Sequence, residues 1–96
     1  MRNITKESVL AFNNSENFKK SNTEVKVLGS SVKLLLHGNR IAERIGGNLY
    51  ISDGGYPLSL TTKERLNGLH GVRVHTSKGI HYLNGEVWDG SRTKIK

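Results

Sequence analysis

The stretch Thr61-Thr62-Lys63-Glu64-Arg65-Leu66-Asn67-Gly68 carries the start and stop signals of a complete short helix. Thr61 can accept a hydrogen bond from a free backbone N–H of the first turn, and Glu64 can reach back to form a capping box. Gly68 can take the left-handed conformation that ends a helix without a Cβ penalty. The sequence therefore predicts a helix over residues 61–67, with Leu66 as its anchor in the core.

The chain before this helix has the period of two that is typical of strands. Residues 24–27 alternate polar and apolar side chains, as a half-buried strand does. Short turn signals follow at Gly29-Ser30, at Gly38-Asn39 and at Gly46-Gly47-Asn48. These turns predict an antiparallel meander whose strands cover residues 24–27, 32–36, 40–45 and 49–52.

The chain after the helix shows the same pattern. Strands are expected at 72–75, 80–83 and 86–88, and residues 92–95 can add an edge strand. Asn84-Gly85 is a strong hairpin signal between two of them. We therefore expect an α+β fold: a small antiparallel, curled β-sheet or partly open barrel of about six or seven short strands, with one short helix.

Residues 1–22 differ from the rest and are predicted to form an N-terminal helical arm. Thr5 can cap a helix that runs to Phe12, and residues 16–20 can resume it after Asn13-Asn14-Ser15. We expect Phe12 and Phe18 to pack the arm on the sheet. The predicted organisation is an arm at 1–22 and a single β-rich domain at 23–96.

Composition narrows the classes of function. The 96 residues contain no cysteine, which excludes disulfides and thiolate chemistry, and no signal peptide or membrane span is expected. The formal charge is +7, and the pI is near 10.0. Such an excess favours nucleic acid or an acidic protein surface as partner, although it can also serve solubility alone.

No motif in the chain points to catalysis or to a cofactor. The four histidines, at 37, 70, 75 and 81, lack the spacing of a metal site, and the carboxylates are scattered. Gly46-Gly47 and Gly54-Gly55 belong to no phosphate-binding fingerprint. We expect no catalytic residue, no metal, no cofactor and no enzyme activity; the alternative is an enzyme that processes nucleic acid.

Basic residues on several predicted elements are the best binding candidates. Arg40 and Arg44 are an even number apart on one strand, which would project both to the same side. The helix start at Thr61 and Thr62, with Lys63, can hold an anion, although this helix can also serve only to plug one end of a barrel. The predicted basic face consists of Arg40, Arg44, Lys63, Arg65, Arg73 and Lys78.

Four fragments in this order resemble a family of small proteins encoded by bacteriophages. They are residues 36–42 (LHGNRIA), residues 49–56, residues 61–69 (TTKERLNGL) and residues 82–88 (YLNGEVW); together they cover about Leu34 to Gly90. The resemblance implies an accessory protein made in the cytoplasm of a host bacterium. It transfers no catalytic residue. We therefore expect binding without turnover, to a host or defence complex such as a CRISPR effector, or alternatively directly to DNA or RNA.

Overall fold

The computed structural model describes residues 2–95, which form two helices and nine strands. In chain order these are α1 (Asn3–Asn13), β1 (Phe18–Lys20), β2 (Thr23–Leu28), β3 (Ser31–Leu36), β4 (Asn39–Ile45), β5 (Asn48–Ile51), α2 (Leu60–Asn67), β6 (Val74–Ser77), β7 (Ile80–Leu83), β8 (Glu86–Val87) and β9 (Thr93–Ile95).

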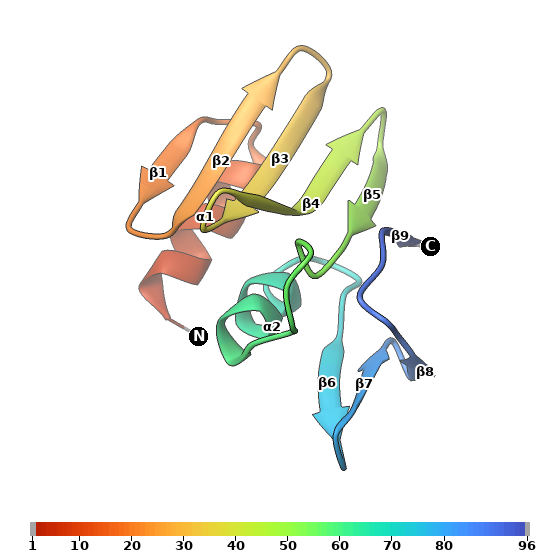
Figure 1. Ribbon diagram of the computed structural model, residues 1–96. Helices are drawn as coiled ribbons and strands as arrows, with labels where there is room; N and C mark the ends of the chain where they lie inside the picture. Colours follow the sequence, from red (N-terminus) through yellow and green to blue (C-terminus); the bar gives the residue numbers. More distant parts are fainter. Residues whose placement is uncertain (1, 96) are drawn as a thin grey trace.

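The strands form two antiparallel sheets. The main sheet has the order β1-β2-β3-β4-β5-β9, so the last strand of the chain pairs with β5, and β6-β7-β8 form a separate smaller sheet. The α+β prediction is confirmed. The main sheet remains open with two edges, as Figure 1 shows, and the small sheet lies below it beside β9.

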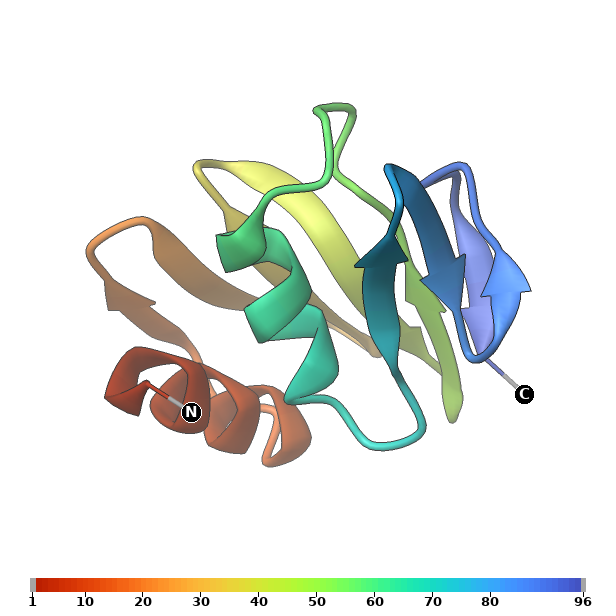
Figure 2. The same cartoon turned by 90° about the horizontal axis from the view of Figure 1, so that it is seen from below.

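Both helices lie on one face of the main sheet. In Figure 1 α1 lies behind β2 and β3, and in Figure 2 α2 lies between α1 and β6. Apolar side chains at alternate strand positions meet Phe12 of α1 and Leu66 of α2 there. The apolar core residues that are at most 2% exposed are Phe12, Val25, Leu34, Ile41, Ala42, Ile51, Leu66 and Val74.

The N-terminal helix packs on the sheet as expected, because Phe12 is only 2% exposed. The predicted resumption of helix over residues 16–20 is wrong. Phe18–Lys20 form β1, which pairs with β2 through a tight turn at Ser21-Asn22. Ser21 has a positive φ of 54°, which closes that turn and directs the chain back along the sheet.

The predicted caps of α2 are both corrected. The N-cap is Ser59 rather than Thr61: its hydroxyl accepts from the Thr62 backbone N–H at 3.1 Å. Gly68 is not left-handed, because its φ is −74° and its ψ is −16°. A Cβ on Gly68 would lie 2.7 Å from Val9 Cγ2, so glycine is needed there for the close approach of α1.

Glu64 and Arg65 join the helices instead of capping or facing solvent. The Arg65 side chain is 1% exposed, and its guanidinium donates to the hydroxyls of Thr5 in α1 and Thr23 in β2. Glu64 accepts from Arg65 at 2.7 Å, from Arg2 at 2.7 Å and from Thr5 at 2.6 Å. Burial, followed by the charge of Arg2, lowers the pKa of Arg65, which nevertheless stays protonated.

Candidate nucleic-acid interface

One face of the main sheet is not covered by either helix; we call it the open face, and it is turned toward the viewer in Figure 1. Side chains alternate across each strand, so the residues between the core positions project here. Six basic and two acidic side chains within residues 2–95 follow this pattern. They are Lys19, Lys26, Lys33, Arg40, Arg92 and Lys94, with Glu24 and Glu43.

The strand register arranges part of this set in one row across the sheet. Lys26 lies opposite Lys33, and Lys33 lies opposite Glu43. The row continues through Tyr50 to Lys94. With strands spaced about 4.8 Å apart, the row is about 19 Å long. Two like charges directly opposite each other destabilise a sheet, so the pairing of Lys26 with Lys33 does not serve stability.

A β-bulge in β4 decides which arginines reach the open face. Leu34 pairs with Ala42 whereas Leu35 pairs with Arg40, so Ile41 is an extra residue. The bulge reverses the alternation and places Arg40 and Arg44 on opposite faces. The prediction that Arg40 and Arg44 share a side is therefore wrong.

Arg44 lies on the helix side and acts on α1. Its guanidinium donates to the Phe12 carbonyl at 2.9 Å and to the Ser15 hydroxyl at 2.7 Å, and it stacks 5.0 Å from the centre of the Phe12 ring. A cation at the last carbonyls of a helix satisfies free acceptors and the helix dipole. Arg44 is thus a structural cap and not part of an exposed basic face.

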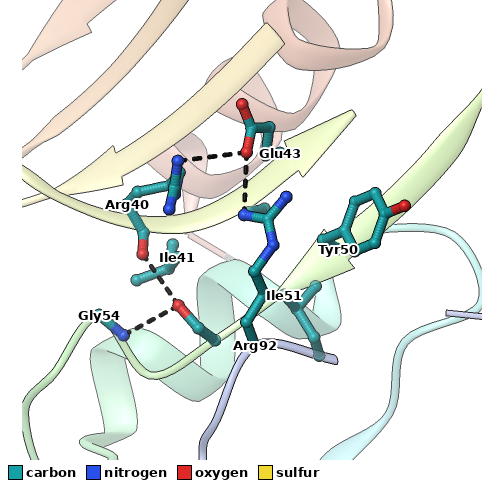
Figure 3. A pocket seen from close by; sticks show the side chains of 9 residues that line it. Arg40, Ile41, Glu43, Tyr50, Ile51, Gly54 and Arg92 are labelled. Atoms are coloured by element: carbon teal, nitrogen blue, oxygen red, sulfur yellow. Dashed lines mark hydrogen bonds and ion pairs between the residues drawn. The ribbon is translucent and has the colours of Figure 1, made fainter. Parts of the chain in front are cut away.

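Arg40 and Arg92 meet at Glu43 on the open face; Figure 3 shows the contacts of the three side chains. Their Nη1 atoms lie 3.2 and 2.9 Å from the same Glu43 oxygen, and Arg92 stacks on Tyr50 at 4.5 Å. Burial disfavours the Glu43 carboxylate, but hydrogen bonds from Ser31 and Arg92 and the charges of Arg40 and Arg92 outweigh it. Together they hold the pKa of Glu43 below its usual value.

The other members of the predicted basic face are dispersed. Arg65 is buried between α1, α2 and β2. Lys63 donates to the Thr76 hydroxyl at 2.9 Å and ties α2 to β6. Arg73 precedes β6, and Lys78 lies in the turn between β6 and β7; both are exposed, but they belong to the small sheet.

At the start of α2, the groups of the predicted anion site already make hydrogen bonds to other groups of the protein. Ser59 already accepts from the Thr62 backbone N–H, and the Ser59 and Thr62 hydroxyls lie 3.0 Å apart. The Thr61 hydroxyl accepts from Arg2 at 3.4 Å. These contacts leave fewer groups of Thr61 and Thr62 for a ligand than the sequence pattern indicates.

Residues 2–95 contain neither a cluster of metal-binding side chains nor a helix that could cross a membrane. No cluster of three or more His, Asp or Glu side chains in that part of the chain is arranged to share a metal ion. Two of the four histidines have other side-chain contacts: His75 stacks on Tyr82 at 5.0 Å, and His81 Nδ1 lies 2.7 Å from the Thr76 hydroxyl. Neither helix of the described chain has the length and apolar character needed to cross a membrane.

The sequence reasoning omitted most of the open face. Lys26 and Lys33 each lie in a strand in which polar and apolar residues alternate. That alternation indicates which side of the strand is exposed. The bulge at Ile41 has no comparable signal, because no glycine or proline marks it. Arg92 precedes β9 and reaches Glu43 only because β9 pairs with β5.

Comparison with known proteins gives the family. The model of the Kyanoviridae Gp96 protein family matches residues 1–93. The chain belongs to this family. It is therefore a member of a family of small phage-encoded proteins, which confirms the resemblance, and the match extends beyond Leu34 to Gly90 to include the N-terminal helix. No curated protein and no solved structure matches the chain.

Proposed function

We propose that this phage protein acts by binding, without turnover, and that its open face engages the nucleic acid of a host or defence nucleoprotein machine inside the bacterial cell. An anti-CRISPR-like inhibitor is one form of such a protein. The observation that carries the proposal is the row of unpaired lysines on a sheet face without a helix. Within residues 2–95, Lys26, Lys33 and Lys94 make no ion pair, so their charges are available to a polyanion.

Action without turnover is supported by the contacts of three of the eight carboxyl groups. A general acid or base works best with a pKa near the operating pH. Partners instead lower the pKa values of Glu43, Glu64 and Asp89 from their usual values. These three carboxylates are held ionised by structural contacts, which suits a binding scaffold.

The test compares two double variants with equal changes in charge. Lys26→Gln with Lys33→Gln removes two charges from the open face, and Arg73→Gln with Lys78→Gln removes two from the small sheet. Each lost phosphate contact reduces the slope of log K against log salt by about one unit. For binding to the host nucleoprotein, we expect the slope of log K against log salt to decrease by about two units in the first variant and to stay unchanged in the second.

Capture from host lysate, with and without nuclease treatment, identifies the component that is bound. Loss of the captured complex after nuclease treatment supports contact with nucleic acid. Capture that resists nuclease but still requires Lys26 and Lys33 would point to an acidic protein surface instead. Equal binding by both double variants and the unchanged protein would refute the open face as the binding surface. Nucleic-acid cleavage that a point mutation abolishes would refute binding without turnover.

A further inference from the structure

The pocket between Arg40 and Arg92 has a charge arrangement that fold stability does not require. It has a volume of about 290 Å³ and is bordered by Glu43, Tyr50 and Ser52. Two guanidinium groups approach one oxygen of one carboxylate, so the cluster of three side chains keeps a net positive charge. One arginine would be enough to neutralise Glu43.

The two guanidinium groups are held in place before any ligand binds. Glu43 is 5% exposed; its second oxygen accepts from Ser31 at 2.8 Å, so the carboxylate is fixed from both sides. Arg92 is also stacked on the Tyr50 ring. A fixed carboxylate and a fixed ring restrict the orientation of Arg92, which lowers the entropy lost when a ligand is bound.

Most of the donor capacity of these arginines remains unused. Each guanidinium has five N–H groups. Within residues 2–95, Glu43 is the only acidic partner of either side chain, and no other hydrogen-bond acceptor contacts them. The Arg40 and Arg92 side chains are 47% and 41% exposed, so the remaining donors are accessible from the pocket and from solvent.

We propose that Arg40 and Arg92 form a phosphate-binding site and that Glu43 is its positioning residue. Two guanidinium forks that converge from β4 and from the segment before β9 fit a tetrahedral oxyanion, which can accept paired N–H donors from both. A carboxylate ligand, with two oxygens, would be satisfied by one fork. Lys33 and Lys94 flank the pocket in the strand register, where neighbouring phosphates of a polymer would need cations.

The phosphate-binding site adds a specific contact to the proposed function. It depends on that function only for the identity of the molecule that carries the phosphate. The chemistry is shared by an internal phosphate of a nucleic-acid strand, a terminal phosphate and a free nucleotide. Separate titrations with inorganic phosphate, a nucleoside monophosphate, and one oligonucleotide with and without a terminal phosphate distinguish these sources. A preference for the oligonucleotide that persists without its terminal phosphate would identify internal phosphates.

The direct readout is the NMR signal of each arginine Nε–H group during titration of the full chain with inorganic phosphate. Sodium chloride at matched ionic strength serves as the control. We expect saturable shifts at Arg40 and Arg92, and no such shift at Arg73 on the small sheet. Small linear shifts shared by all arginines, equal to those in chloride, would overturn the site.

Charge-conserving variants test the fork geometry. We expect Arg92→Lys and Arg40→Lys each to weaken phosphate binding about tenfold, because a lysine keeps the charge but loses the paired donors. Arg73→Lys is the matched control and should bind as the unchanged protein does. Arg40 lies outside the Tyr50 stack, so Arg40→Lys tests the site even if Arg92→Lys disturbs folding. Unchanged affinity in folded Arg40→Lys would overturn the proposal.

The variant Glu43→Gln distinguishes two roles for Glu43: positioning of Arg40 and Arg92, or repulsion of the anionic ligand. If Glu43 only repels anions, removal of its charge tightens phosphate binding; if it positions both arginines, binding weakens although the site becomes more positive. Tighter binding would overturn the positioning role. Failure of this inference can be distinguished from failure of the proposed function. Phosphate-induced shifts at Arg40 and Arg92, together with undiminished capture of the host target by the Lys26 and Lys33 double variant, would support the phosphate site and refute the proposed function. Loss of capture in that variant without such shifts would support the proposed function and refute the phosphate site.

Discussion

Gly68→Ala tests the contact that brings α1 and α2 together. Gly68 has right-handed helical angles, so alanine itself would be favoured there by about 0.5–1 kcal/mol. Its Cβ would however lie 2.7 Å from Val9 Cγ2 and 3.1 Å from Thr5 Cγ2. Valine in a helix has one strongly preferred rotamer, so it cannot turn away easily. Overpacking of this kind costs about 1–3 kcal/mol.

We expect Gly68→Ala to lower the free energy of unfolding by about 1 kcal/mol, which corresponds to a decrease in Tm of about 4–8 °C for a domain of this size.

Urea unfolding of Gly68→Ala, Val9→Ala and the double variant measures the coupling free energy between the two substitutions. Removal of the Val9 methyl groups should make Gly68→Ala close to neutral, a coupling of about 1 kcal/mol. A left-handed Gly68 would give the same single-variant loss but no coupling, so additivity within about 0.5 kcal/mol would refute the steric explanation.

Two further predictions concern the contacts that join the helices. The Thr5 hydroxyl, Arg2 and then Arg65 lower the pKa of Glu64 from 4.5 to about 2, so its stabilising effect is complete above pH 4.5 and is lost as the pH falls from 4.5 through 2. Urea midpoints measured across that range should decrease less in Glu64→Gln than in the unchanged protein; parallel curves would contradict this assignment. Arg65→Leu should lower the free energy of unfolding by about 3–5 kcal/mol, because it leaves the buried Thr5 and Thr23 hydroxyls and Glu64 without their shared donor. Arg65→Lys should recover only part of that free energy in the same urea assay.

The fold class could be predicted because turn chemistry is local. Asn84 and Gly85 both have positive φ, 51° and 88°, as the expected hairpin turn requires. The turn before β4 is His37-Gly38, one residue earlier than predicted, again with two positive φ values. Such turns depend on two neighbouring residues, so a single sequence is enough to place them.

The placement of the arginines could not be predicted because it depends on distant partners. Arg65 sits between a glutamate and a leucine in a helix, a context that usually leaves an arginine exposed. It is buried because Thr5 and Thr23 supply acceptors 60 and 42 residues away. Arg44 similarly depends on the bulge at Ile41 and on the end of α1.

Two arginines on the helix side each satisfy several acceptors at once. They are Arg44 and Arg65, and the planar fork of the guanidinium suits this task. On the open face the cations without ion pairs include Lys26 and Lys33, and a hydrated lysine ammonium attracts phosphate without fixed geometry. Arg40 and Arg92 combine both properties there. In the binding mode proposed above, the lysines would therefore set the salt dependence of affinity, and the Arg40–Arg92 pocket would set the position of the strand on the sheet.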